Sequence, residues 1–168
     1  GGNEAYSSPV QVPGTTWSKV YAQGTATYAI KTDGTLWAWG HGYGGKLAQN
    51  NQVQYSSPVQ IPGTNWSSSG KLGGGAEGAF FKTDGTLWVW GRNTYGGLGL
   101  NNTTFYSSPV QLPGTTWRSV SQGVFTMGST RTDGTLWSWG YNDQGHLGHN
   151  NRTNYSSPVQ VPGTWNLD

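Results

Sequence analysis

Thr83–Trp88 (Thr-Asp-Gly-Thr-Leu-Trp) decides the fold, because the same six residues stand again at 32–37 and at 132–137. A second block, Ser-Ser-Pro-Val-Gln, occurs four times and begins at Ser7, Ser56, Ser107 and Ser156. Successive copies of each block are 49 or 51 residues apart. Self-similarity at such a period is the signature of a repeat protein. We therefore predict a single repeat domain over 1–168, with units at about 7–55, 56–106 and 107–155 and a partial unit at 156–168.

Each copy of the first block predicts a β-hairpin. Asp84-Gly85 stands between two runs of β-forming residues. Asp-Gly is the preferred pair in tight type I′ turns, where both central residues need positive φ. In the first repeat the arm after the turn, 35–39, alternates Leu36 and Ala38 with Trp37 and Trp39, so it is apolar on both sides. A strand of this kind must be covered on both faces.

Two further strands complete each unit. Ser-Ser-Pro-Val-Gln predicts a third strand, in which proline favours a strand start or a sheet edge. A Pro-Gly-Thr turn follows, and a tryptophan at 17, 66, 117 and 165 opens a fourth strand. Four strands per unit, covered on both faces, predict a propeller blade. The expected fold class is all-β, with three tandem four-stranded propeller-type blades and a partial fourth.

The number of strands raises the question of closure. The chain holds three Asp-Gly hairpins but four Ser-Ser-Pro-Val-Gln strands, whereas propellers have 4 to 8 blades. We therefore expect an incomplete propeller or open arc, unless other copies or a longer chain complete it. A start at Gly1-Gly2 without methionine favours a trimmed or excised chain. Uncapped ends of repeat arrays expose apolar faces, so we expect a species larger than 18.0 kDa.

Composition narrows the class of protein. Charged residues make up 10% of the chain and aromatic residues 14%, which excludes a disordered chain. The formal net charge of +2 is small and its charges are scattered, so no nucleic-acid partner is expected. No apolar run reaches the roughly 18 to 20 residues of a membrane span, so no membrane insertion is expected. The absence of cysteine excludes disulfides and thiolate metal sites.

The second and third repeats extend the pattern to Thr-Asp-Gly-Thr-Leu-Trp-x-Trp-Gly, followed by Asn-x-x-Gly-x-Leu-Gly. The matching positions are Asp84 to Gly91, Asn93, Gly96, Leu98 and Gly99, and then Asp133 to Gly140, Asn142, Gly145, Leu147 and Gly148. This pattern resembles the regulator of chromosome condensation repeat family over nearly the whole chain. The first repeat departs at Gly42 and Ala48, so its loop is expected to differ.

The resemblance implies a β-propeller that binds protein partners through loops on one face. Members of the family include an exchange factor for a small GTPase, a β-lactamase inhibitor and a plant light sensor that uses tryptophans. The light sensor's Gly-Trp-Arg-His-Thr motif is absent here. Trp37, Trp88 and Trp137 are therefore interpreted as packing residues rather than as a chromophore.

No pattern of catalytic residues occurs, so we expect no enzyme and no cofactor. The chain lacks a Gly-x-Ser-x-Gly elbow, a phosphate loop and a His-Glu-x-x-His motif. Asp33, Asp84 and Asp133 recur, but at separate hairpin tips, where the turn itself favours Asp-Gly. Lys31, Lys82 and Arg131 recur before the turns as a basic rim or, as we favour, as solvated strand ends.

One cluster has the spacing of a metal site. Asp143, His146 and His149 could offer ligands from one loop, but the pattern occurs in a single repeat, so no metal site is expected.

These observations favour a non-catalytic protein-binding or structural scaffold, acting through variable loops such as 70–78 and 101–105. The partner would be another protein or copies of the same chain, in an extracellular, cell-surface or virion setting. One alternative is a lectin-like module that binds glycans, because amide and ring side chains recur in the loops. Its candidate residues are Asn101, Asn102, Tyr106, Asn150, Asn151 and Tyr155. Another is nucleotide exchange on a small GTPase, which only the resemblance suggests.

Overall fold

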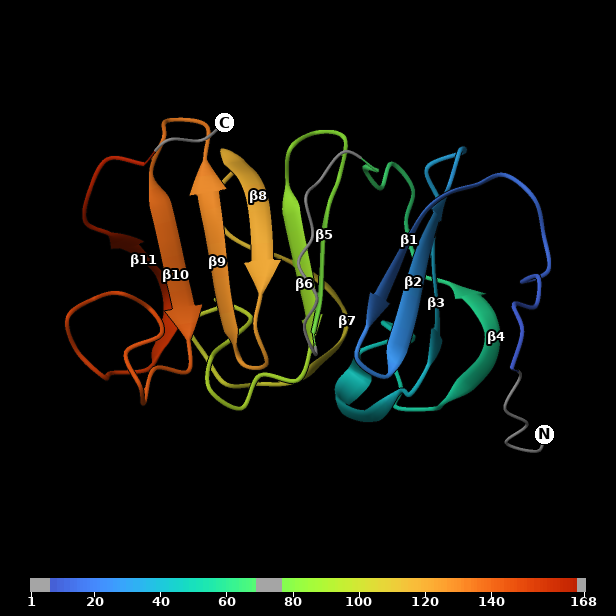
Figure 1. Cartoon of the computed structure of the whole chain (residues 1–168), viewed down its shortest axis with the longest axis horizontal. Helices are drawn as coiled ribbons and strands as arrows, with labels where there is room; N and C mark the ends of the chain where they lie inside the picture. The colour runs from blue at the N-terminus through green and yellow to red at the C-terminus, as the bar shows by residue number, and fades with distance from the viewer. Residues whose placement is uncertain (1–6, 69–76, 166–168) are drawn as a thin grey trace.

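The computed structural model describes residues 7–68 and 77–165, and these form antiparallel strands (Figure 1). Within them, no helix is long and apolar enough to cross a membrane. The elements are β1 (Trp17–Gln23), β2 (Ala26–Lys31), β3 (Leu36–Gly40), the 3₁₀ turn η1 (Tyr43–Gly45), β4 (Tyr55–Gln60), β5 (Gly78–Phe81), β6 (Leu87–Gly91), β7 (Tyr106–Gln111), β8 (Trp117–Gln122), β9 (Thr126–Arg131), β10 (Leu136–Gly140) and β11 (Tyr155–Val161).

The strands form three sheets that stand side by side (Figure 1). Their orders are β1-β2-β3-β4, β5-β6-β7 and β8-β9-β10-β11, and we call them the first, second and third blades. The second blade shows three strands, preceded by an isolated bridge between Trp66 and Lys82. The predicted variable loop at 70–78 falls largely on residues 69–76, which lie outside the described residues. The expected all-β fold of propeller-type blades is confirmed.

The sheets are out of phase with the sequence units counted from Ser7. The first and third blades begin with the strand that follows the Pro-Gly-Thr turn, and the second begins at β5; in all three the Ser-Ser-Pro-Val-Gln strand lies at an edge of the sheet. The prediction of four Ser-Ser-Pro-Val-Gln strands is wrong for the first copy, since residues 7–11 form no strand and are exposed. In the blades this strand pairs with the Trp-x-Trp strand, as Trp37 pairs with Gln60. Residues 7–11 have no such neighbour, so their backbone has no ladder to join.

The three Asp-Gly hairpins are confirmed, but their predicted type I′ geometry is wrong. Only the glycine has positive φ, 78° at Gly34, and the aspartates do not. The Gly34 N–H donates to the Lys31 carbonyl, and the Lys31 N–H donates to the Thr35 carbonyl, each at 3.0 Å. This is a three-residue turn that ends in a left-handed glycine. The Asp33 carboxylate favours it, because it accepts hydrogen bonds from N and Oγ1 of Thr35 at 2.9 and 2.6 Å.

The hydrophobic core lies between the blades. Tyr28 and Ile30 of the first blade meet Phe80 and Trp90 of the second, and the rings of Phe80 and Trp90 stack at 5.5 Å. A second cluster joins the second and third blades through Leu87, Val89, Leu98, Trp117, Met127 and Trp139. The apolar faces predicted for the Trp-x-Trp strands are therefore covered by neighbouring blades.

We call the contact between the first and second blades the first joint and the contact between the second and third blades the second joint. Polar contacts reinforce both joints in the same way. The Trp90 indole donates to the Lys46 carbonyl at 2.8 Å, and the Trp139 indole donates to the Gly97 carbonyl at 2.9 Å. The loop backbone then bonds the last strand of the next blade: Asn50 N–H to the Ser107 carbonyl, and Asn101 N–H to the Ser156 carbonyl, both at 2.7 Å.

Close packing at the joints also explains a recurring glycine. A Cβ on Gly45 would lie 2.6 Å from the Ser107 Cα, and a Cβ on Gly96 would lie 2.4 Å from the Ser156 Cα. No side chain fits at either distance, so the loop of one blade and the last strand of the next meet backbone to backbone.

The loop of the first blade differs from the other two, as predicted. It contains η1, where the other loops have turns. Gly42 replaces the asparagine, and a Cβ there would lie 2.0 Å from the Val53 carbonyl oxygen. Ala48 takes the place of Gly99 and Gly148 and keeps their left-handed backbone, with φ 56° against 74°.

Candidate binding site

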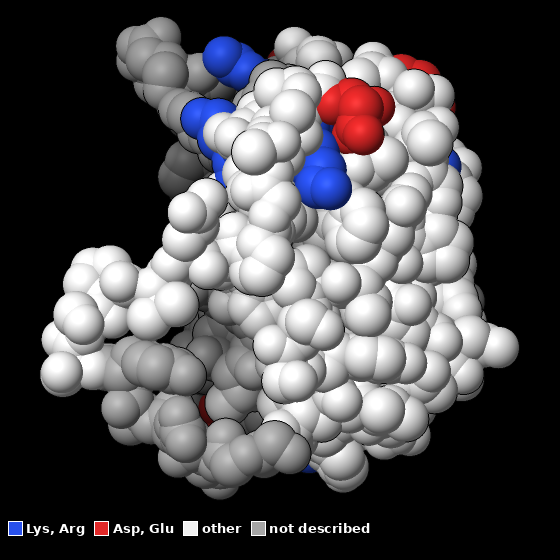
Figure 2. Space-filling view, turned by 90° about the vertical axis from the view of Figure 1, so that its right-hand side faces the viewer, with Lys and Arg blue, Asp and Glu red and all other residues white. Residues whose placement is uncertain are grey.

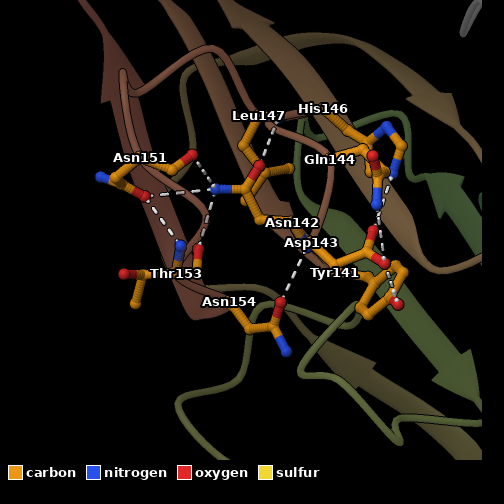
Figure 3. Close-up of polar contacts among 9 residues, drawn as sticks. All are labelled: Tyr141, Asn142, Asp143, Gln144, His146, Leu147, Asn151, Thr153 and Asn154. Carbon is orange, nitrogen blue, oxygen red and sulfur yellow. Dashed lines mark hydrogen bonds and ion pairs between the residues drawn. The ribbon is translucent and has the colours of Figure 1, made fainter.

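The loop between β10 and β11 is held in shape by one buried side chain, Asn142 (Figure 3). Its Oδ1 accepts a hydrogen bond from the Leu147 N–H at 3.0 Å. Its Nδ2 donates to the carbonyls of Asn151 and Thr153 at 3.1 and 3.0 Å. Asn93 occupies the same position in the second blade, where it bonds Leu98 and Asn102. The amide thus replaces the backbone ladder that a loop lacks.

The asparagine and tyrosine residues proposed for glycan binding largely bond each other. Asn102 Nδ2 donates to the Tyr106 hydroxyl at 3.1 Å, and its Oδ1 accepts from the Thr104 N–H. Asn151 and Tyr155 repeat this arrangement at 3.0 Å. Asn101 and Asn150 have left-handed backbones, with φ 58° and 54°. Shaping the loops accounts for these residues, and their glycan-binding role stays a prediction.

A different set of side chains in the third loop faces outward. The Tyr141 hydroxyl donates to Oδ2 of Asp143 at 2.6 Å, and His146 Nε2 lies 3.4 Å from Oδ1 of the same carboxylate (Figure 3). The hydrogen bond raises the pKa of Tyr141 and lowers the pKa of Asp143. At neutral pH the tyrosine is therefore protonated and the carboxylate is ionised.

Aromatic rings from three segments gather around Tyr141, the hydrogen-bond donor of this carboxylate. Tyr95 lies 4.5 Å from Tyr141 and 5.2 Å from Phe125 between ring centroids, and Arg92 covers Phe125 at 5.2 Å. Beside them is a hollow of about 370 Å³ lined by Val124, Phe125, Thr126, Tyr141 and His146. Val124 is 67% exposed. We call Tyr95, Val124, Phe125, Tyr141, Asp143 and His146 the aromatic hollow.

His149, the third member of the Asp143, His146 and His149 cluster, takes no part in this site. His149 Nε2 lies 3.0 Å from the Ser138 hydroxyl, and the His149 ring packs edge-on against Tyr155. Among the residues that the structure describes, no three His, Cys, Asp or Glu side chains are grouped as metal ligands. The loop brings Asp143 and His146 together and leaves His149 in a packing role.

The basic residues before the hairpin turns are not simply solvated. Each lies between two tryptophan rings: Lys31 Nζ is 4.9 Å from Trp17 and 4.2 Å from Trp37, and Arg131 Cζ is 4.3 Å from Trp117 and 3.9 Å from Trp137. Lys82 repeats the arrangement in the second blade. The cations thus stabilise the rim of each blade through cation–π contacts.

Trp37, Trp88 and Trp137 are bonded into the hairpin turns. The Trp37 indole donates to Thr35 Oγ1 at 2.9 Å, and Thr35 Oγ1 donates in turn to Asp33. The same relay occurs in the other two blades. This geometry supports the packing interpretation of the three tryptophans.

These turns predict a loss of stability in acid. Hydrogen bonds from Thr35, Thr86 and Thr135 lower the pKa of Asp33, Asp84 and Asp133. A lowered folded-state pKa gives stability that is present above the ordinary carboxyl pKa of about 3.9 and is lost as the pH falls through the folded-state value. We expect the melting temperature to fall below about pH 4. Thermal melts of the triple Asp→Asn variant should show a weaker acid dependence, and an equal dependence would contradict the assignment.

The aromatic hollow escaped sequence analysis, which singled out only Asp143 and His146. Its rings come from Tyr95, Phe125 and Tyr141, on three separate segments, and no spacing rule connects them. Comparing equivalent positions of the three repeats could have indicated this site. At the position of Tyr141 the other units have Arg92 and His41, and at the position of His146 they have Gly97 and Lys46. Otherwise similar repeats therefore differ at this site.

Comparison with known proteins identifies the repeat. The family model for the regulator of chromosome condensation (RCC1) repeat matches residues 84–129 and 133–166. No curated protein sequence matches the chain.

Solved structures share the fold. Human WBSCR16 is 21% identical with a TM-score of 0.75, and the match covers 87% of this chain and 38% of that protein. Prp20p from Saccharomyces cerevisiae, crystallised in work on its binding to Gsp1p and histones, is 17% identical with a TM-score of 0.78 over 89% and 39%. The structure of Kap60 bound to yeast RCC1 (Prp20) matches with 17% identity and a TM-score of 0.76, and the match covers 89% of this chain and 37% of that chain. The chain therefore spans less than two fifths of each of these solved chains.

Proposed function

Because this chain belongs to the RCC1 repeat family, we propose that it is a non-catalytic module that binds a protein partner through the aromatic hollow. The observation that carries the proposal is the half-buried ring cluster of Tyr95, Phe125 and Tyr141, in which Tyr141 also hydrogen-bonds the Asp143 carboxylate. Solved neighbours with this fold bind proteins, as Prp20p does with Gsp1p and histones. That precedent supports the class of partner and leaves its identity to experiment.

The composition of the hollow suits protein recognition. Tyrosine, phenylalanine and arginine are enriched in the cores of protein interfaces, where they bury large areas at low entropic cost. Here Arg92 already covers Phe125, and Val124 adds an exposed apolar side chain. A residue that only shapes the blade would recur in each repeat, as Trp88 and Trp137 do. The hollow instead uses positions at which the repeats differ, which favours recognition over architecture.

The charge of the hollow suggests which peptide segments fit. Asp143 is ionised and its side chain is 44% exposed, although Oδ1 itself is shielded from solvent, 3.4 Å from His146. A lysine or arginine of the partner would pair with the exposed part of this carboxylate. An apolar side chain beside it would pack on Tyr141 and Val124. The expected ligand is therefore a segment with a basic residue next to an apolar one.

Peptide-library selection on the whole chain tests this function. Enriched peptides should combine basic and apolar residues. Tyr141→Ala and Asp143→Asn should each weaken their binding about tenfold or more, since both remove part of an anchoring contact. Tyr43→Ala is the matched control, because Tyr43 is an exposed aromatic residue at the equivalent position of Asp143 in the first loop. A selection without enrichment, or binding that depends on Tyr43 and not on Tyr141, would exclude the hollow.

The absence of catalysis is part of this proposal. Asp143 and His146 lie 3.4 Å apart, and the hydroxyl next to them in the described loop belongs to Tyr141. That hydroxyl donates its hydrogen bond to Asp143, so it is not activated as a nucleophile. Exchange activity on a small GTPase stays a prediction, and an exchange assay that shows no acceleration would dismiss it.

A further inference from the structure

The two joints inside the chain define what a blade needs from its neighbours. In each, the loop of one blade supplies a close-approach glycine, a carbonyl acceptor and an asparagine. The next blade supplies two serines of its last strand and an indole N–H. At the second joint these groups are Gly96, Gly97 and Asn101 on one side, and Ser156, Ser157 and Trp139 on the other.

The third blade presents the loop half of a joint, and no strand within 7–68 or 77–165 is seated in it. A hollow of about 290 Å³ is lined by Gly145, Asn150, Asn151 and Arg152. A Cβ on Gly145 would be 3.9 Å from its nearest neighbour, whereas the equivalent Cβ atoms on Gly45 and Gly96 would be within 2.6 Å of a serine. Asn150 already has φ 54°, close to 55° at Asn50 and 58° at Asn101. The seat is therefore formed before any partner enters it.

The first blade presents the strand half. Ser56 and Ser57 are exposed, while the equivalent serines at both internal joints are half-buried. Val20 is 67% exposed, against 2% for its equivalent Val120. Trp39 is only half-buried, and its indole N–H has no hydrogen-bond partner among the described residues, unlike those of Trp90 and Trp139. Figure 2 shows that this side of the molecule carries few charged side chains, gathered mainly near its upper edge.

Polar side chains on the free face of the third blade already hydrogen-bond within the blade, so a docked partner could bury them without breaking their hydrogen bonds. Ser119 and Thr130 hydrogen-bond each other at 2.6 Å, and the Ser138 hydroxyl donates to the Leu147 carbonyl at 2.7 Å. Burial is costly for polar groups that lose their partners, and these keep theirs. Gly128 and Thr130 stand where Tyr28 and Ile30 fill the first joint, so this contact buries less apolar surface.

We propose that a second copy of the chain docks head to tail across these two faces, with its Ser56–Ser57 strand in the seat at Gly145 and Asn150. By the register of the internal joints, the Asn150 N–H donates to the Ser56 carbonyl, and Trp39 donates to the His146 carbonyl. Such a heterologous contact closes a ring or extends an array. Two copies provide six sheets, within the range of known propellers. The inference goes beyond the proposed function: its seat lies on the β10–β11 loop that also carries Tyr141, but it uses backbone groups of that loop and the exposed face of the first blade rather than the aromatic rings.

The test is the mass of the full chain in solution, measured by sedimentation equilibrium and light scattering at increasing concentration. The wild-type chain should reach twice its 18.0 kDa mass or a higher multiple. Ser56→Arg should remain at 18.0 kDa with an unchanged circular dichroism spectrum, because the arginine lies on an exposed strand but cannot enter the seat. Ser7→Arg is the matched control. Ser7 begins the same motif, is exposed and lies outside every joint, so this variant should assemble like the wild type.

Trp39→Phe provides a second, milder variant that keeps an aromatic ring and removes the N–H. We expect its association to weaken about tenfold, the effect of one hydrogen bond in a covered site. A wild-type chain that stays at 18.0 kDa up to millimolar concentration would overturn the proposal. So would a multimer that Ser56→Arg leaves intact, because its interface would then lie elsewhere.

Discussion

Replacing Trp90 with alanine should lower the free energy of unfolding by about 4 kcal/mol, the upper range for removing a large buried aromatic side chain. Trp90 is fully buried between the first and second blades. It stacks on Phe80 with centroids 5.5 Å apart and lies 6.2 Å from Tyr28. The change also removes the indole hydrogen bond to the Lys46 carbonyl at 2.8 Å, although that carbonyl keeps a second hydrogen bond from the Tyr28 hydroxyl. The cavity and the lost bond act at the same joint.

Trp39→Ala is the matched control for this prediction, because Trp39 has the same place in the first blade. It is half-buried and makes no indole hydrogen bond among the described residues. We expect a cost of about 1 to 2 kcal/mol, less than half of that at Trp90. Denaturant unfolding at low protein concentration, where the chain is monomeric, measures both. If Trp90→Ala and Trp39→Ala lowered the free energy of unfolding by the same amount, the contact between the first two blades would add nothing to the stabilising effect of Trp90.

Replacing Asn142 with alanine should cost about 3 kcal/mol, because buried groups lose their partners. The amide is 0% exposed and accepts a hydrogen bond from the Leu147 N–H, itself a buried donor. It also donates to the carbonyls of Asn151 and Thr153. No other side chain can replace these contacts from one position, so the loop should lose its order. Because Tyr141, Asp143 and His146 lie on the same loop, ligand binding at the aromatic hollow should fall with it.

Asn154→Ala is the control for Asn142. Asn154 is exposed and accepts one hydrogen bond, from the Asn142 N–H at 2.7 Å. Its loss should cost about 1 kcal/mol or less. Hydrogen exchange of the Leu147 amide reports the loop directly: it should accelerate strongly in Asn142→Ala and slightly in Asn154→Ala. A Leu147 amide that stays protected in Asn142→Ala would contradict the structural role assigned to this side chain.

Local features of the fold could be predicted from sequence, and interactions between distant segments could not. The hairpin around Asp84-Gly85 and the apolar strand that follows it depend on neighbouring residues, and both are confirmed. The type I′ turn was a wrong prediction, because the contact of Asp33 with Thr35 favours a longer turn with a single left-handed glycine. The predicted strand at 7–11 failed for a different reason: a strand needs a partner, and its motif says nothing of whether one is present.

The candidate site shows the same division. Asp143 and His146 attract notice by their spacing in sequence, yet His149, which has the same spacing, lies within hydrogen-bond distance of Ser138 instead. Phe125 comes from the turn between β8 and β9, and Tyr95 comes from the loop of the neighbouring blade, so their meeting with Tyr141 depends on how two blades pack. Spacing along the chain carries no information about that packing.

By itself, the sequence determined that this protein is built from repeated antiparallel β-blades, because turn residues and alternating apolar residues act over a few neighbouring positions. Only the tertiary structure decided how the copies of each motif differ in use. Ser107 and Ser156 lie in joints, Ser56 lies on an open face and Ser7 lies in no strand, although all four begin the same five residues. The physical reason is that a joint is a contact between two blades, so the role of each serine depends on the blade beside it.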